Sequence, residues 1–309
     1  MRLMPGGRLC GEKRVKLLLS MVSDDVRRRY AEEISAIVKG CSVPLLKAFA
    51  NVPREGFLGS GPWRVLSRIS GKMQPQVTEV MDPAELYHDV AVLLDPARNL
   101  TNGNPTTLAP WLDGLNLSPR VSVFHLGCGT GYYTAIMAEM VGPAGRVTAV
   151  EVDPILAARA RTNLAGYRNV EVVEGDGGSI DVGPRDAILI NAGVTHPRDN
   201  WLDNLHTGGI LVLPLSVEIG TPNVGKGLVL KVAKLQSGYT ADFFPAPVMI
   251  QSCSGVRDPA LAKRLGPRFA LGSSGVVKSL RRDAHPPEAD CWLHTSAFCL
   301  SHRPVNNQR

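Results

Sequence analysis

The sequence predicts an α/β fold, in which a doubly wound, mostly parallel sheet follows N-terminal helices and precedes an extra C-terminal β-rich segment. Three observations support this prediction. Between residues 121 and 215, short apolar runs alternate with helical patterns. These runs lack alternating polar residues, which indicates parallel strands buried on both faces of the sheet. After residue 228 the apolar runs look antiparallel, with prolines and a Gly/Ser-rich stretch between them.

The N-terminal part of the chain is expected to be helical after a disordered leader. Residues 1–22 carry positive charge beside an apolar stretch that is too short to span a membrane, and no small-residue cleavage pattern follows. Residues 23–25, Ser-Asp-Asp, then form a helix N-cap cluster, and apolar residues recur at helical spacing until Gly40. A second short helix is expected over residues 44–49. The predicted helical segment covers residues 23–81.

The rest of the chain divides into a core and an extension. In the core, residues 82–235, predicted strands and helices alternate. The strands are expected at 121–126, 147–152, 170–173, 187–190 and 210–215, and the helices at 132–141, 154–164 and 199–205. Residues 236–309 form a C-terminal extension that we expect to pack on the core.

Composition excludes several classes of partner. Hydrophobic residues make up 44% of the 309 residues and charged residues 20%, which is ordinary for a globular protein, and no apolar run is long enough for a membrane span. Residues 1–30 hold eight basic and three acidic residues, and therefore carry five of the six net positive charges. A nucleic-acid-binding protein would more often spread basic residues over its folded face, so neither nucleic acid nor membrane is an expected partner.

The cysteine pattern predicts reduced thiols and a cytoplasmic protein. The six cysteines include no C-x-x-C pair, which argues against a zinc site and against a disulfide framework. His294 lies between Cys291 and Cys299, but the spacing C-x-x-H-x-x-x-x-C supplies no fourth ligand. No metal site is therefore predicted.

A glycine-rich turn, FHLGCGTGYYTA at residues 124–135, follows the first predicted strand of the core. Gly127, Gly129 and Gly131 lie at alternate positions, where bare backbone N–H groups can approach a ligand closely. A dinucleotide-binding turn has the spacing G-x-G-x-x-G, because its glycines hold a pyrophosphate. The shorter G-x-G-x-G spacing suits a ligand that lays a carboxylate and an ammonium group across the turn.

Two acidic residues at the ends of the next strands narrow the choice of ligand. Glu151 ends the second strand, where its carboxylate can accept hydrogen bonds from both hydroxyls of a ribose. Asp176 follows the third strand and can accept a hydrogen bond from the exocyclic amine of an adenine. The turn and the two acids together predict S-adenosyl-L-methionine as the cofactor. His125 either contacts the methionine end of this cofactor or is a core histidine.

These motifs, in their order along the chain, resemble those of the protein-L-isoaspartate O-methyltransferase family from about residue 45 to residue 215. The resemblance also rests on FANVPREGF (49–57), YHD (87–89), VEVDP (150–154), NVEVVEGDG (169–177) and GGILVLPL (208–215). It implies a Rossmann-like methyltransferase fold and transfer of a methyl group to a carboxylate, as in protein repair. The cofactor-binding residues that it implies are Gly127, Cys128, Gly129, Thr130, Gly131, Tyr132, Glu151, Asp176 and Gly177.

The expected acceptor loop departs from the family's pattern, T-I-S-x-P. Residues 101–105 read Thr-Asn-Gly-Asn-Pro, so Gly103 replaces the serine that the family places beside the accepting carboxylate. In this respect the chain resembles a divergent bacterial branch of the family. Thr101, Asn102 and Gly103 are the expected acceptor-site residues.

The methyl acceptor is left open between a peptide or protein carboxylate and a small molecule. A carboxylate is already ionised at neutral pH and needs no general base. A hydroxyl or amine acceptor would need one, and His196, after the fourth strand, is the expected base. The alternative functions are a methyltransferase for a small molecule or a peptide natural product, and a non-catalytic module that binds the cofactor.

Overall fold

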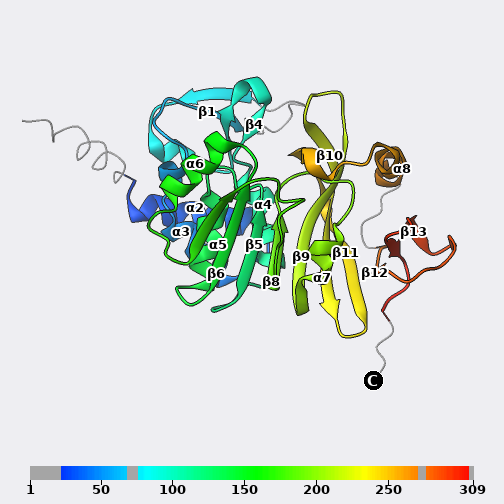
Figure 1. The fold of residues 1–309 in the computed structure, drawn as a ribbon. Helices are drawn as coiled ribbons and strands as arrows, with labels where there is room; N and C mark the ends of the chain where they lie inside the picture. Colours follow the sequence, from blue (N-terminus) through cyan, green and yellow to red (C-terminus); the bar gives the residue numbers. More distant parts are fainter. Residues whose placement is uncertain (1–21, 68–75, 271–275, 306–309) are drawn as a thin grey trace, which may run out of the picture.

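A computed structural model of the chain describes residues 22–67, 76–270 and 276–305. The predicted leader, residues 1–22, lies outside these ranges except for Val22. Within the described ranges, no helix is long and apolar enough to cross a membrane. The chain forms one ten-stranded sheet with helices on its faces, and a four-stranded sheet beside the N-terminal helices (Figure 1).

Ten strands form the main sheet, and half of them pair in parallel. The parallel strands are β5 (Ser122–Leu126), β6 (Arg146–Glu151), β7 (Val170–Glu174), β8 (Arg185–Ile190) and β9 (Leu205–Glu218). The antiparallel strands are β10 (Val224–Leu235), β11 (Gly238–Gln251), β12 (Ser279–Arg281), β13 (Cys291–His294) and β14 (Cys299–Ser301). Their order in the sheet is β13-β14-β12-β11-β10-β9-β8-β5-β6-β7.

The inner parallel strands β5, β6 and β8 are buried on both faces because alternate side chains enter two different cores. Val123 belongs to the core that includes α5 (Tyr132–Val141) and α6 (Pro154–Asn163). Its neighbour Phe124 belongs to the core on the other face, which includes α7 (Asp199–Asp203). This arrangement confirms the predicted doubly wound α/β fold with its C-terminal β-rich segment.

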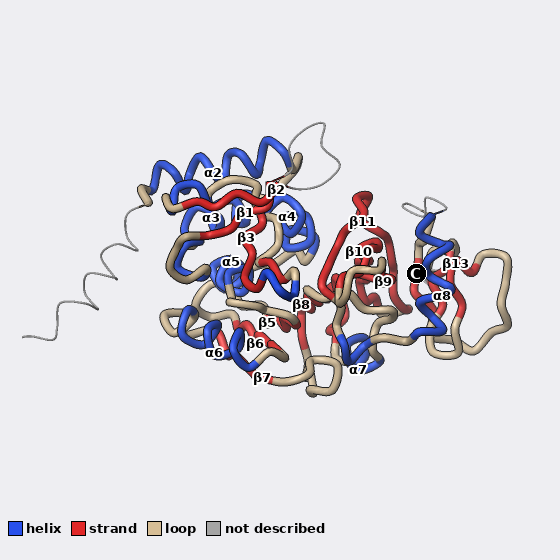
Figure 2. The backbone as a smooth tube through the Cα atoms, turned by 90° about the horizontal axis from the view of Figure 1, so that it is seen from above, coloured by secondary structure: helices blue, strands red, loops and turns tan. Residues whose placement is uncertain are grey.

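The N-terminal region combines helices with a small antiparallel sheet. Helices α2 (Asp24–Ile37), α3 (Val43–Asn51) and α4 (Pro105–Gly114) gather on one side of the molecule (Figure 2). The small sheet consists of β1 (Trp63–Ser67), β2 (Gln76–Val80), β3 (Ala91–Asp95) and β4 (Leu100–Thr101), in the order β2-β1-β3-β4. The helical segment predicted over residues 23–81 thus also contains β1 and β2. Strand β2 was not predicted because it is mostly exposed, and its sequence therefore lacks the alternation of apolar and polar residues that indicates a strand.

The C-terminal extension continues the main sheet. Strands β10 and β11 form one hairpin, so the predicted boundary after residue 235 falls in the turn between two paired strands. Strand β12 pairs with β11, β14 with β12, and β13 with β14. Helix α8 (Pro259–Ala270) contacts β9, β10 and β13. Figures 1 and 2 show α8 and β13 on the side of the molecule opposite to α2 and α3.

Candidate functional site

A cleft of about 620 Å³ lies at the carboxyl ends of the parallel strands. Residues 126–130, 151–153 and 175–177, at the ends of β5, β6 and β7, line one part of it, and residues 99–104 before α4 line another. Open parallel sheets bind ligands at this edge, and sites for cofactor-sized molecules have volumes of roughly 300–1,000 Å³. The predicted cofactor turn and the predicted acceptor loop therefore face the same cleft.

Backbone geometry explains the three glycines of the turn. Gly127, Gly129 and Gly131 all have positive φ angles, of 76°, 56° and 95°. A Cβ on Gly127 would lie 2.9 Å from the carbonyl oxygen of Asn191, and a Cβ on Gly131 would lie 2.7 Å from Leu164. Gly129 instead has open space around it and lines the cleft. Gly131 does not line the cleft, so its contribution is the close packing of the turn against the end of α6.

Glu151 is held at the cleft by two backbone hydrogen bonds. The N–H of Gly129 donates to its Oε2 at 2.7 Å, and the N–H of Asp153 donates to its Oε1 at 3.1 Å. Glu151 is only 7% exposed, and this burial raises the pKa of the carboxyl above its ordinary value. The two N–H donors fix the orientation of the carboxylate, while its remaining lone pairs can accept from the hydroxyls of a ligand.

Asp176 and Gly177 line the cleft directly after β7. The Asp176 carboxylate accepts hydrogen bonds from the N–H of Gly178 at 2.9 Å and from the hydroxyl of Ser179 at 3.1 Å. A Cβ on Gly177 would lie 2.5 Å from Leu126, so a glycine lets this turn approach the end of β5. The predicted adenine site and the predicted cofactor turn are therefore neighbours in space.

Asn102 ties the acceptor loop to the small sheet. The N–H of Val92 donates to Asn102 Oδ1 at 2.8 Å, and the N–H of Asn102 donates to the carbonyl of Val92 at 3.0 Å. The Nδ2 of Asn102 is buried and has no hydrogen-bond partner among the described residues. Asn102 lines the cleft, so this buried donor, for which the described residues offer no partner, lies beside the wall of the cleft.

Gly103 has a conformation that favours glycine. Its φ is 78°, and a Cβ there would lie 3.0 Å from Leu108 Cδ2. The Tyr133 hydroxyl donates to the Gly103 carbonyl at 3.0 Å, which links the acceptor loop to α5. The Thr101 hydroxyl oxygen accepts from the Gly103 N–H at 3.2 Å. The backbone conformation of this loop thus favours glycine at the position where a serine was expected from the resemblance.

A buried arginine that the sequence alone did not single out supports residues 86–90, which precede β3. Arg54 lies in the 3₁₀ helix η1 (Arg54–Phe57) and is fully buried. Its guanidinium donates to the carbonyl groups of residues 86, 88 and 90 at 2.5–3.0 Å, and it lies over the rings of Tyr30 and Tyr132. The Tyr87 hydroxyl donates to Glu55. In the sequence, the motif VPREGF could have indicated this buried arginine, because it places Arg54 and Glu55 between apolar residues.

Two predicted site histidines lie outside the cleft lining. His125 is fully buried and faces α5, where its Nδ1 lies 2.9 Å from Thr134 Oγ1. Burial lowers the pKa of His125 to about 3, so its imidazole is neutral at pH 7. The structure therefore favours the core-histidine alternative. His196 is half-buried, and its Nδ1 lies 2.9 Å from Thr195 Oγ1.

Two further walls of the cleft come from segments that no motif indicated. Leu66 of β1 and Leu94 of β3 line it from the small sheet, and Pro247, Met249 and Gln251 line it from β11. Met249 is 62% exposed. These strands are far apart in the sequence, and only the fold brings them to the same opening.

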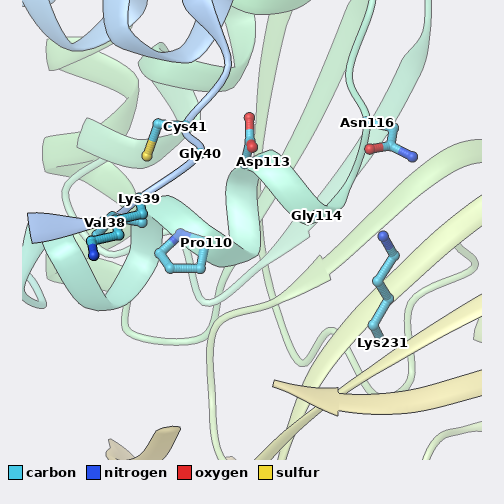
Figure 3. Close-up of a pocket in the computed structure, with 9 residues that line it drawn as sticks. All are labelled: Val38, Lys39, Gly40, Cys41, Pro110, Asp113, Gly114, Asn116 and Lys231. Atoms are coloured by element: carbon cyan, nitrogen blue, oxygen red, sulfur yellow. The ribbon is translucent and has the colours of Figure 1, made fainter. Parts of the chain in front are cut away.

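A smaller hollow of about 300 Å³ lies between the connection of α2 to α3, helix α4 and strand β10 (Figure 3). Its lining includes Cys41, Asp113 and Lys231. The Asp113 carboxylate accepts a hydrogen bond from the N–H of Ser42 at 3.2 Å and so fixes the start of α3. None of the described residues that line this hollow belongs to the cofactor turn or the acceptor loop.

Comparison with known sequences identifies related proteins. Residues 76–225 match the family model for protein-L-isoaspartate(D-aspartate) O-methyltransferase. The protein-L-isoaspartate O-methyltransferase of Ignicoccus hospitalis is 34% identical over 169 residues, which cover 52% of this chain and 77% of that protein. The enzyme of the same name from Thermotoga maritima is 28% identical over 186 residues, which cover 58% of this chain and 53% of that protein.

Solved structures agree with the observed fold. A protein-L-isoaspartate O-methyltransferase superposes with a TM-score of 0.59 at 23% identity, over 78% of this chain and 68% of that one. A putative protein-L-isoaspartate O-methyltransferase from Plasmodium falciparum, in complex with S-adenosyl-L-homocysteine, gives a TM-score of 0.54 at 17% identity, over 74% and 98% of the two chains. The Rossmann-like methyltransferase fold is thereby confirmed. The chain belongs to the protein-L-isoaspartate O-methyltransferase family and, as predicted, is an S-adenosyl-L-methionine-dependent carboxyl O-methyltransferase.

Proposed function

We propose that this cleft transfers a methyl group to the carboxylate of an isoaspartyl residue in a peptide or protein. One observation carries the proposal: the glycine turn, Glu151 and Asn102, whose side-chain amide nitrogen has no hydrogen-bond partner among the described residues, all line a single cleft. The related proteins from Ignicoccus hospitalis and Thermotoga maritima are named for methyl transfer to isoaspartate, which supports the same acceptor here.

The residues of the cleft fit S-adenosyl-L-methionine. Gly129 leaves an open surface without a side chain, which suits the methionine end, while Glu151 suits the ribose hydroxyls and Asp176 the adenine amine. The bound cofactor supplies an electrophilic methyl group. Burial raises the pKa of the Cys128 thiol, so this neighbouring group stays protonated and does not compete as a nucleophile.

The acceptor side of the cleft suits a group that is already ionised. No histidine or lysine occurs among the described residues that line the cleft, and a carboxylate needs neither as a base. The amide of Asn102 can donate to one carboxylate oxygen and leave the other oxygen to attack the methyl group. The chain then accelerates the reaction by orienting the acceptor and excluding water.

The test is an assay of the purified full chain with methyl-labelled S-adenosyl-L-methionine and an isoaspartyl peptide, with the aspartyl isomer as the control substrate. We expect base-labile label on the isoaspartyl peptide alone. Asn102→Asp keeps the acceptor for the Val92 N–H but replaces the amide donor with a negative charge. It should lower kcat/KM by about 5- to 150-fold, because an unpaired or repelled polar group costs about 1–3 kcal/mol.

Asn116→Asp is the matched control, because Asn116 is exposed and does not line the cleft. It should leave kcat/KM unchanged. If the wild-type chain binds S-adenosyl-L-homocysteine but labels no isoaspartyl peptide, the proposed acceptor is wrong while the cofactor assignment remains.

A peptide natural product of defined sequence is the second candidate acceptor. The β11 wall, with Met249, favours it, because these residues lie beyond the family match that ends at residue 225 and still line the cleft. Met249→Asp should then change the ranking of a set of peptide substrates without changing the affinity for S-adenosyl-L-homocysteine. An unchanged ranking would count against selection by this wall.

A further inference from the structure

A second cluster of reactive side chains lies in the C-terminal extension, away from the cleft. His285, Cys291, His294 and Cys299 each offer one ligand atom, and these four atoms all lie within 4.8 Å of one another. The sequence spacing suggested three ligands and no fourth, but the fold brings His285 from the loop before β13 into the cluster. We propose that these four residues bind a zinc ion.

The β13–β14 hairpin places three of the four side chains on one face. His294 lies opposite Cys299 across the ladder, and Cys291 lies opposite Ser301. Residues three apart on a regular strand point to opposite faces, but the pairing register shifts between Cys291 and Leu293. The extra residue of this irregularity returns Cys291 to the face that carries His294.

His285 has the hydrogen bond that is typical of a metal-binding histidine. Its Nδ1 donates to the carbonyl of Asp283 at 2.8 Å, so the unprotonated Nε2 is left to bind a metal in the cluster. This Nε2 lies 3.6 Å from the Sγ of Cys291. A tetrahedral zinc ion with Zn–N of about 2.05 Å and Zn–S of about 2.3 Å separates two such atoms by about 3.6 Å. The observed separation therefore matches one edge of the coordination tetrahedron.

The surroundings leave these atoms available to a metal. The Nδ1 of His294 is buried and has no hydrogen-bond partner in the described part of the chain. The N–H of Glu288 donates to the Sγ of Cys291 at 3.3 Å, which stabilises negative charge on this sulfur. The nearby carboxylates of Glu288 and Asp290 are ion-paired with Arg303, so their negative charge is already balanced.

The geometry indicates a structural role for the ion. Four protein ligands close the coordination sphere, whereas a catalytic zinc keeps one position open. Six strands separate β13 from β5 in the sheet, which puts the cluster on the order of 30 Å from the glycine turn. Strands β12, β13 and β14 have three or four residues each, so a metal that joins loop 282–290 to the hairpin would stabilise this end of the sheet.

The test is the metal content of the full-length chain, purified without an affinity tag and without a chelator, and measured by elemental mass spectrometry. We expect one zinc per chain in the wild type, and a loss of at least ten-fold in Cys299→Ser and His285→Gln. The matched controls Cys41→Ser and His302→Gln lie outside the cluster and should keep the metal. Cobalt in place of zinc should give the intense visible absorption of a tetrahedral thiolate site.

Three results would overturn the proposal. The reduced wild-type chain could contain no zinc and bind none on titration, the ligand variants could retain as much zinc as the controls, or Cys291 and Cys299 could form a disulfide in the purified protein. The wild-type measurement needs no substitution, so it decides the question even where a variant fails to fold.

Discussion

Replacing Gly103 with serine tests whether backbone geometry or side-chain chemistry governs the acceptor loop. The substitution restores the family's serine, so an explanation based on side-chain chemistry alone predicts a gain in activity. The structure predicts a loss, because the φ of Gly103 is 78° and an added Cβ would lie 3.0 Å from Leu108 Cδ2.

Two costs add at this position. A residue with a Cβ pays about 1–2 kcal/mol in the left-handed conformation, and overpacking beside Leu108 adds about 1 kcal/mol or more. We expect Gly103→Ser to lower the free energy of unfolding by about 2–3 kcal/mol. Gly40→Ser isolates the backbone cost of about 1–2 kcal/mol, because Gly40 also has a positive φ but open space around it. Gly166→Ser has neither cost and should change stability by less than about 0.5 kcal/mol.

The assay is urea unfolding followed by tryptophan fluorescence, together with kcat/KM for an isoaspartyl peptide. We expect Gly166→Ser to be the most stable of the three variants, Gly40→Ser to be intermediate and Gly103→Ser to be the least stable. Gly103→Ser should also have the lowest kcat/KM. If Gly103→Ser unfolds with the wild-type free energy and transfers methyl groups faster, the geometric explanation of this loop is refuted.

Three further predictions concern the support of the cleft. Glu151→Gln should weaken S-adenosyl-L-homocysteine binding by about tenfold or more in titration calorimetry, because hydrogen bonds to a charged acceptor are lost. Arg54→Leu should lower the free energy of unfolding in urea by about 3 kcal/mol or more, since three carbonyl groups lose their donor, whereas the exposed Arg64→Leu should change it little. Folding lowers the pKa of His125 from 6.5 to about 3, so between these values the unfolded chain binds the extra proton. The free energy of unfolding should therefore fall by up to about 1.4 kcal/mol for each pH unit below 6.5, because of His125. The variant His125→Gln should lose this pH dependence, whereas His88→Gln, which changes an exposed histidine, should keep it.

The parts of the site that the sequence predicted are those that depend on local geometry. Gly127 and Gly129 follow a buried strand, and Glu151 and Asp176 end the next two, so parallel pairing alone brings them to one edge. The same local rule also explains why the structure favours the core-histidine alternative for His125. Strand alternation puts His125 on the same face as Val123, beneath α5, and thus away from the cleft.

The parts that the sequence did not predict depend on contacts between distant segments. The wall at Met249 comes from β11, and the buried Arg54 reaches carbonyl groups more than 30 residues further along the chain. His285 joins Cys291 only because a loop folds back over the β13–β14 hairpin and the register of β13 shifts by one residue. The spacing of residues in the sequence does not predict such contacts, because each contact depends on how helices, strands and loops pack against one another.

A crystal structure of the chain with S-adenosyl-L-homocysteine tests the central claim most directly. We predict that its ribose hydroxyls bond to Glu151, that its adenine lies beside Asp176, and that its sulfur faces the acceptor loop at Asn102. A ligand bound outside this cleft, or one whose sulfur points away from residues 101–104, would contradict the assignment of both the cofactor site and the acceptor site.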